Sequence, residues 1–181
     1  MKKKILIGLA VLLGAFVLFV VYTNLFPASP KKMANFSNDS GLEIKVSYSG
    51  PFKKGRLIFG EEKDKALQPY GKYWRLGANA ATEITFNKNV TFGGKPVNAG
   101  TYRMYAVPGA TSFQVSLNSG TGVFFAVREP NYDLDVVKVD AAVSVSPETE
   151  QLNITIDRDS TGVNLNCAWD KIKFSVPITV Q

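Results

Sequence analysis

From Leu42 onward, apolar and polar residues alternate with a period of two, and this pattern limits the fold more than any other feature of the chain. Apolar residues take every second position in the segments 44–48, 84–86, 102–106, 113–117, 152–156, 163–169 and 172–178. This is the period of a strand with one buried and one solvated face. A further strand is predicted over 136–145. No window beyond residue 41 keeps a helical period, so helix is limited to a short turn around 61–67, and the domain is predicted to be all-β.

Turn residues separate these segments where a β domain needs them. Gly93-Gly94 predicts a two-residue hairpin, because such turns need positive φ, which glycine adopts at little cost. The apolar phase changes between Trp169 and Ile172, which requires a tight turn or a bulge at 170–171. Many short strands at this spacing indicate an antiparallel two-layer β-sandwich, of jelly-roll or immunoglobulin-like type.

The N-terminal segment, residues 1–26, has a different character. Three lysines, Lys2 to Lys4, precede an uncharged apolar run from Ile5 to Tyr22. A helix of that length approaches the roughly 30 Å of a bilayer's hydrocarbon core, so a transmembrane signal anchor through residues 5–22 is expected. The lysines would stay in the cytoplasm, with the domain outside it, periplasmic or at the cell surface. Signal cleavage, which would release a secreted domain, is the alternative.

The remaining chain divides into a linker and one domain. Residues 27–41 are rich in Pro, Ser and Asn and show no apolar period, so they are predicted to be a flexible linker. Residues 42–181 contain no internal repeat and form a single predicted β-sandwich domain.

The composition of the chain argues against several classes of function. The net charge of +6 owes much to the N-terminal lysines, and no later basic run exceeds two residues, so no nucleic-acid partner is expected. The chain has no histidine, which excludes Ser-His-Asp and Cys-His catalysis and His-ligated zinc or haem. The single cysteine, Cys167, lies in an apolar phase and is predicted to be a small buried hydrophobe. No cofactor and no metal is expected, and any catalysis would depend on carboxylates.

Three motifs carry a family resemblance. They are Tyr73-Trp74-Arg75-Leu76-Gly77-Ala78-Asn79, then Ala99-Gly100-Thr101-Tyr102, then Trp169-Asp170-Lys171. In this order they resemble an exported bacterial family of domains of unknown function, over roughly 42–180. The resemblance implies a periplasmic or secreted β-sandwich and brings no established activity. Leu76 stands where a Thr is expected and Ala80 where a Glu is expected, so a function of that Glu would be lost here.

The stretch 70–86 is the predicted functional region, because it joins a loop rich in polar and aromatic residues to a strand edge. Trp74 either stacks on a planar ligand such as a sugar or plugs the end of the sandwich. Arg75 either binds a carboxylate or phosphate or pairs internally with Glu83 or Asp135. Asn79 either contacts ligand or holds a turn. The candidate ligand-binding residues are Trp74, Arg75, Asn79, Glu83, Tyr102, Tyr105 and Asp135, and no catalytic residue is assigned.

Two functions remain open. The first is a membrane-anchored extracytoplasmic binding or interaction module for carbohydrate or another envelope protein. The second is a hydrolase of envelope or extracellular glycans, which would need paired carboxylates such as 61–64 or Asp133 with Asp135. The same acids could also hold calcium, or could simply be solvated.

Overall fold

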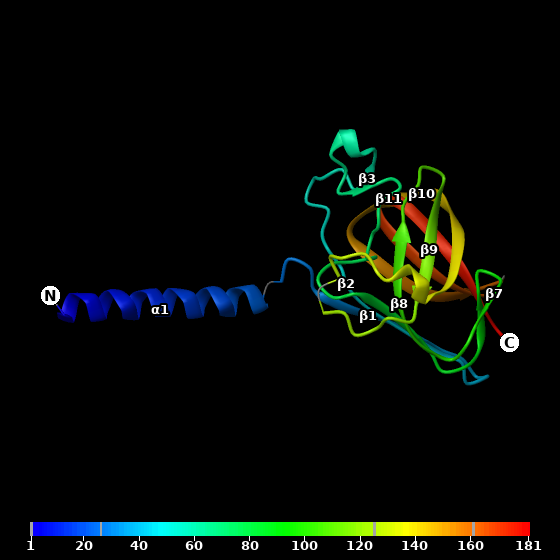
Figure 1. Ribbon diagram of the computed structural model, residues 1–181, viewed down its shortest axis with the longest axis horizontal. Helices are drawn as coiled ribbons and strands as arrows, with labels where there is room; N and C mark the ends of the chain where they lie inside the picture. Colours follow the sequence, from blue (N-terminus) through cyan, green and yellow to red (C-terminus); the bar gives the residue numbers. More distant parts are fainter. Residues whose placement is uncertain (1, 26, 125, 161) are drawn as a thin grey trace.

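The computed structural model describes residues 2–25, 27–124, 126–160 and 162–181, and it is all-β after one N-terminal helix (Figure 1). The strands are β1 (Lys31–Ser37), β2 (Glu43–Ser49), β3 (Phe59–Gly60), β4 (Gln68–Pro69), β5 (Thr82–Phe86), β6 (Val90–Phe92), β7 (Lys95–Val97), β8 (Gly100–Val107), β9 (Ser112–Asn118), β10 (Asp135–Asp159) and β11 (Gly162–Val180). Short 3-10 turns, η1 (Glu62–Asp64) and η2 (Tyr132–Leu134), complete the domain. The predicted all-β class is confirmed, as is the short helical turn.

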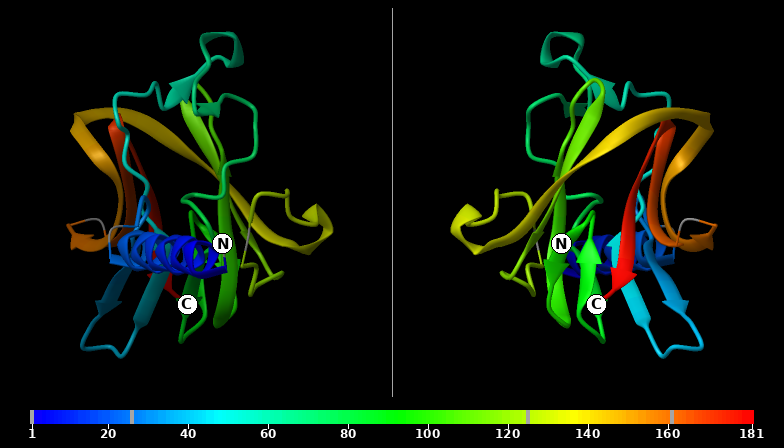
Figure 2. Two further views of the ribbon diagram at one scale, coloured as in Figure 1. Left: turned by 90° about the vertical axis from the view of Figure 1, so that its left-hand side faces the viewer. Right: turned by 90° about the vertical axis from the view of Figure 1, so that its right-hand side faces the viewer.

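The strands form one mostly antiparallel nine-stranded sheet, in the order β1-β2-β5-β8-β9-β10-β11-β6-β7, and β3 and β4 make a separate parallel pair. The predicted antiparallel two-layer sandwich is therefore approached by one continuous sheet. Strand β10 pairs with β9 over residues 135–142 and with β11 beyond that, with register shifts between 145 and 153. Long β10 and β11 arch across the domain (Figure 2), so the sheet bends back on itself into a sandwich-like form.

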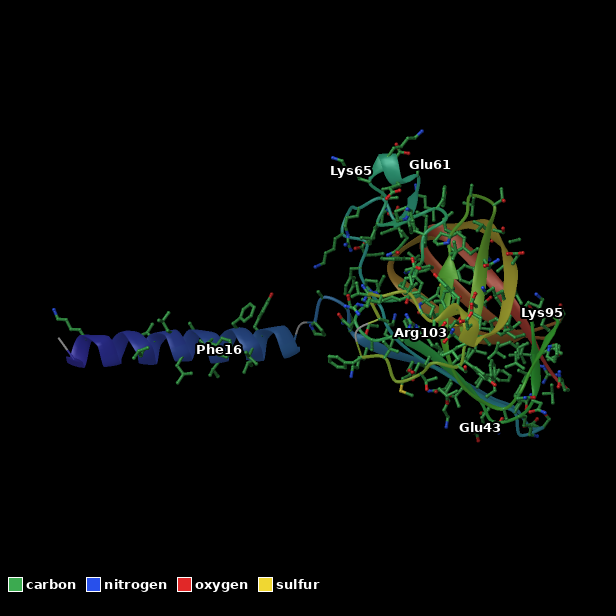
Figure 3. All side chains as sticks on the ribbon, in the orientation of Figure 1. Phe16, Glu43, Glu61, Lys65, Lys95 and Arg103 are labelled. Carbon is green, nitrogen blue, oxygen red and sulfur yellow. The ribbon has the colours of Figure 1, made fainter. Side chains whose placement is uncertain are left out.

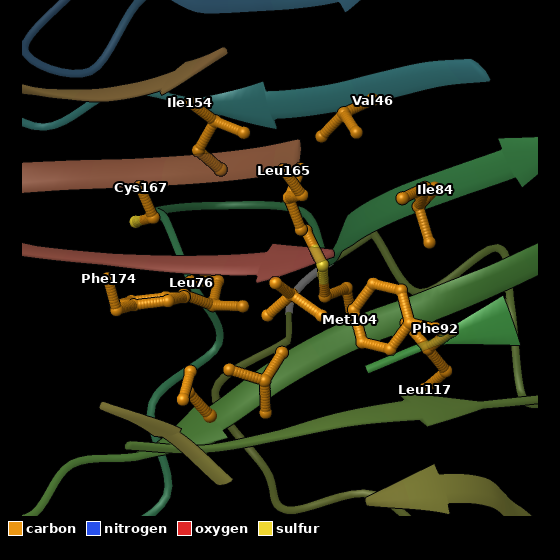
Figure 4. Close-up of a cluster of buried hydrophobic side chains, with 14 of the residues drawn as sticks. Val46, Leu76, Ile84, Phe92, Met104, Leu117, Ile154, Leu165, Cys167 and Phe174 are labelled. Atoms are coloured by element: carbon orange, nitrogen blue, oxygen red, sulfur yellow. The ribbon is translucent and has the colours of Figure 1, made fainter. Parts of the chain in front are cut away.

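The core lies between the two facing halves of this sheet. Phe86 on β5 lies 6.4 Å from Phe92 on β6, and Phe113 on β9 lies 5.3 Å from Phe174 on β11, measured between ring centroids. Figure 4 shows apolar side chains from both halves gathered together with Phe92 and Phe174. Cys167 is among them and is buried, as predicted. Burial of this alternating apolar set is the main stabilising contribution to the fold.

The N-terminal segment forms α1 (Lys2–Leu25), but the prediction of a transmembrane helix is wrong. In the part of the chain that the structure describes, no helix is both long enough and apolar enough to cross a membrane. Met1 and Phe26, the ends of the predicted segment, lie outside the described residues.

The predicted linker, 27–41, contains strand β1, so the folded domain begins before Leu42. Strand β1 pairs with β2 along its whole length. Its alternation is hidden in the sequence because Lys32 is half-buried whereas Met33 is 67% exposed. The Lys32 Nζ donates to Gln151 Oε1 at 3.4 Å, so a lysine takes an inward position by reaching a polar partner on β10.

The change of phase near the C-terminus is a bulge. Strand β11 continues through it, and Asp170 has a φ of 56° at the shifted register opposite Thr149. The predicted bulge, rather than a turn between two strands, therefore accounts for the apolar phases of Trp169 and Ile172.

The Gly93-Gly94 hairpin between β6 and β7 is confirmed, and it supports a stability prediction. Gly93 has a φ of 57°, and a Cβ there would lie 2.7 Å from Val139 Cγ1. Gly94 has a φ of 80° with no atom within 4 Å of its Cβ position. Gly93→Ala should lower the free energy of unfolding by about 2–4 kcal/mol, from backbone strain and overpacking. Gly94→Ala carries the backbone cost alone, about 1 kcal/mol. Urea denaturation compares them, and equal losses would contradict the contact with Val139.

Candidate functional site

Trp74, the leading sequence candidate, lies in the core and not at the surface. It is 2% exposed, and its backbone N–H and C=O both bond to Ala106 on β8 at 2.8 Å. Its indole ring stacks on that of Trp169, with centroids 6.0 Å apart and planes 21° apart, and meets Phe59 edge-on at 5.2 Å. Trp74 therefore plugs the sandwich, the structural alternative allowed by the sequence, and its role as a ligand platform is wrong.

Tyr102 and Asn79 also have structural roles. Tyr102 is buried on the core side of β8, and its hydroxyl donates to the Asn98 carbonyl at 2.9 Å. Asn79 is exposed with a φ of 59°, a left-handed conformation that asparagine tolerates well. Its carbonyl oxygen accepts hydrogen bonds from Ala126 N at 3.1 Å and from Arg75 Nη1 at 3.4 Å. Asn79 thus holds the turn that its sequence context suggested.

Three other candidates, Glu83, Tyr105 and Asp135, lie in or beside a polar row that crosses four neighbouring strands. Strand register places Glu83 on β5 opposite Arg103 on β8, Arg103 opposite Asn118 on β9, and Asn118 opposite Asp135 on β10. Tyr105 follows two residues after Arg103 on the same face. This outer face is not open to solvent, because Arg103 is 4% and Asn118 1% exposed. Figure 3 shows Arg103 inside the domain, far from the outlying turn of Glu61.

The row is closed by a covering segment, residues 119–124 and 126–134, which hydrogen-bonds to each of its first three members. Gly122 N donates to Glu83 Oε1 at 2.6 Å. Arg103 Nη2 donates to the Arg128 carbonyl at 3.0 Å, and Asn118 Nδ2 donates to the Asn131 carbonyl at 2.8 Å. The Arg103 guanidinium also bonds the Tyr73 hydroxyl. The row therefore holds the covering segment on the sheet, although Arg103 Nε is itself buried without an acceptor among the described residues.

Arg103 and Asn118 were missed by the sequence analysis, which placed the odd positions of β8 in solvent. One signal was present: 102–107 is apolar at every position except Arg103. A nearly continuous apolar run is typical of a strand covered on both faces. That run could have indicated a second covering layer, although not which segment supplies it.

Asp135 is bound by three protein partners. Its side chain is 6% exposed and accepts from the Tyr105 hydroxyl at 2.7 Å, from Asn118 Nδ2 at 2.7 Å and from Lys138 Nζ at 2.9 Å. Burial raises the pKa of Tyr105 above its ordinary value, so its hydroxyl stays a donor at neutral pH. Asp135 thus serves as a mostly buried structural acceptor for three protein donors.

The other acidic candidates form no site. Glu61, Glu62 and Asp64 are exposed on the outermost turn, and Asp133 is exposed at η2. Among the described residues, no group of three or more His, Cys, Asp and Glu side chains could hold a metal ion. Burial raises the pKa of the Cys167 thiol, which keeps it protonated and a poor nucleophile. None of these groups has the geometry of a catalytic pair.

Two cavities instead flank the middle of the predicted functional stretch. The sheet-face cavity, about 380 Å³, opens on the outer face of β1, β2 and β5; it is mostly apolar and is lined by residues that include Met33, Ser47, Ala80, Glu83 and Phe124. The end cavity, about 420 Å³, lies at one end of the sandwich and is lined by residues that include Lys54, Arg56, Arg75, Gly77 and Trp169. Both volumes lie in the range of small-ligand sites. Arg75 and Glu83 thus face different cavities, and no internal ion pair joins Arg75 to Glu83 or Asp135 among the described residues.

The geometry defines a sandwich-like β domain with ligand-sized cavities beside the predicted functional stretch and no assembled catalytic pair among its described residues. The chain belongs to the family described as "Protein of unknown function (DUF2911)", whose model matches residues 29–178. The resemblance to a family of domains of unknown function is therefore confirmed. Comparison with curated proteins and with solved structures found no match.

Proposed function

We propose that this protein is a carbohydrate-binding module whose site is the sheet-face cavity. The observation that carries the proposal is the combination, in one open apolar hollow, of an exposed aromatic ring, a carboxylate and a hydroxyl. Phe124 is 77% exposed, Glu83 is half-buried, and Ser47 lies opposite Glu83 in the strand register. Concave, mostly apolar sites with a few convergent polar groups are typical of ligand binding.

The aromatic group suits the apolar C–H face of a sugar ring. Phe124 stands on the covering segment at the rim of the cavity, with Met33 of β1 among the other lining residues. Exposed large apolar side chains gathered at one hollow mark interaction sites. Phe124 takes the stacking role that the sequence suggested for Trp74, because Trp74 is buried in the core.

The polar groups suit sugar hydroxyls. A carboxylate accepts several hydrogen bonds, and Glu83 Oε1 is fixed by the Gly122 N–H at 2.6 Å. That bond orients the carboxylate, and Glu83 Oε2 can still accept from a ligand hydroxyl. The backbone pairing of β5 with β2 and β8 keeps Glu83 on a rigid element.

Binding is favoured over hydrolysis because Glu83 is the only carboxylate among the described residues that line this cavity. Glycoside hydrolysis needs two carboxyl groups about 5 to 10 Å apart across the bond that breaks. Action on an envelope or extracellular glycan would place the domain outside the cytoplasm, a location that stays a prediction from the N-terminal sequence.

A glycan array with the purified full chain, followed by titration of the best glycan, tests the proposal. Phe124→Ala and Glu83→Gln should each weaken binding at least about tenfold, since a hydrogen bond to a charged group contributes about 1.5–3 kcal/mol and a stacked aromatic a comparable amount. Tyr132→Ala removes an aromatic ring that is 42% exposed elsewhere on the domain and should leave binding unchanged. Glycan binding that survives both cavity variants, or no binding at all, would refute this site. Glycan turnover would instead support the hydrolase.

A further inference from the structure

We propose that the end cavity is a second, separate binding site, which takes an anionic group, a carboxylate or a phosphate, with Arg75 as its main recognition residue. Its position and chemistry differ from those of the sheet-face cavity. The described residues that line it include three permanent cations, Lys54, Arg56 and Arg75, and no carboxylate. A hollow lined by one sign of charge focuses the electrostatic potential and concentrates ions of the opposite sign.

The cations of the end cavity are not neutralised within the protein. None of the ion pairs among the described residues includes Lys54, Arg56 or Arg75. Arg56 Nε donates to the Lys53 carbonyl at 2.9 Å, and Arg75 Nη1 donates to the Asn79 carbonyl at 3.4 Å. Backbone carbonyls orient these guanidinium groups without cancelling their charge. Each guanidinium keeps further N–H donors, in the planar fork that matches carboxylate and phosphate oxygens.

Three acidic residues bind the loop that carries Lys54 and Arg56. Lys53, whose side chain is mostly buried, pairs with Glu148 at 2.6 Å and with Asp170 at 2.5 Å. Glu150 accepts from the backbone N–H of Lys54 at 2.8 Å. These contacts fix the loop that carries Lys54 and Arg56, and none of them is an ion pair with either side chain.

A buried, unpartnered donor on the cavity wall gives independent support. Trp169 lines the end cavity and is 1% exposed, and its indole Nε1 has no hydrogen-bond acceptor among the described residues. Buried polar groups are usually hydrogen-bonded, so an unpartnered buried donor on a cavity wall is a candidate contact for a ligand acceptor. An anionic oxygen in the end cavity would supply the acceptor. Trp74 Nε1 is also unpartnered, but Trp74 does not line this cavity.

Titration of the full chain with inorganic phosphate and, separately, with glutarate, at constant ionic strength, tests this site. The chain has only two tryptophans, so ¹H–¹⁵N NMR resolves both indole N–H signals. We expect at least one probe to saturate and to shift the Trp169 signal while the Trp74 signal moves less. Saturation by phosphate alone identifies a phosphate site, and saturation by glutarate alone identifies a carboxylate site.

Arg75→Gln should weaken binding of the preferred probe at least tenfold, and Arg75→Lys less, because the charge remains and the fork is lost. Arg158→Gln removes an exposed arginine from β10 and should change binding less than twofold. Phe124→Ala should leave anion binding intact, which separates this site from the carbohydrate site. If Arg75→Gln and Arg158→Gln weakened probe binding equally, the attraction would be unspecific and the proposal would be overturned. The proposal would also be overturned if neither phosphate nor glutarate showed saturable binding.

Discussion

Replacing Trp74 with alanine should lower the free energy of unfolding by about 3–5 kcal/mol, the range for large-to-small substitutions of buried aromatic residues. The side chain is 2% exposed, and it joins the rings of Phe59, Phe113 and Trp169 in one cluster. Its removal leaves a cavity between the facing halves of the sheet that strands paired on both sides cannot close. The large cost follows from that limited relaxation, because lost contacts and residual cavity volume add.

Urea denaturation of the full chain measures the effect. Trp74→Phe keeps part of the ring cluster, so it should lower the free energy of unfolding clearly less than Trp74→Ala does. Val145→Ala removes an apolar side chain that is 82% exposed on β10 and should be close to neutral. If Trp74→Ala proved as mild as Val145→Ala, Trp74 would not be a core residue, and a surface role in ligand binding would return.

Asp135→Ala should lower the free energy of unfolding by about 2–3 kcal/mol. The substitution leaves the buried hydroxyl of Tyr105 and one N–H of Asn118 without their acceptor, and each such loss costs about 1–3 kcal/mol. Lys138 loses its ion pair as well, but its side chain is 43% exposed, so that part contributes little. The effect comes from desolvated donors and not from the surface charge.

The matched control is Asp140→Ala, which removes an exposed carboxylate from the same strand. Asp135→Asn keeps one acceptor oxygen and should fall between the two. The same denaturation experiment compares all three variants. A result in which Asp135→Ala and Asp140→Ala are equal would show that the carboxylate is not committed to Tyr105 and Asn118, and it would reopen Asp135 as a ligand or catalytic group.

Local features were predictable from the sequence because they depend on residues close together in the chain. The two glycines of the β6–β7 hairpin need only their own φ angles, and the bulge at Asp170 follows from a change of apolar phase within one strand. The burial of Cys167 follows from its phase in β11. These predictions hold because a strand's period fixes which side chains share a face, whatever the strand pairs with.

The candidate site was only partly predictable. Arg75 and Glu83 line cavities, yet they line different ones, on either side of the segment that joins them. Trp74 was correctly recognised as important, but its neighbour across the core, Trp169, lies 95 positions later in the numbering of the sequence and was not linked to it. Which aromatic residue stays exposed, Phe124 rather than Trp74, depends on how the covering segment lies on the sheet.

The sequence by itself determined the all-β class, the main strands, the hairpin and the absence of histidine chemistry. Only the tertiary structure decided that one sheet bends into both halves of the sandwich, and that β1 belongs to it. It also decided that Glu83, Arg103, Asn118 and Asp135 form one row beneath a covering segment. Their alignment depends on the register of four strands, and register arises from pairing between distant segments, which no local pattern encodes. The end cavity also depends on distant segments, because Trp169 of β11 lines it together with Lys54, Arg56 and Arg75.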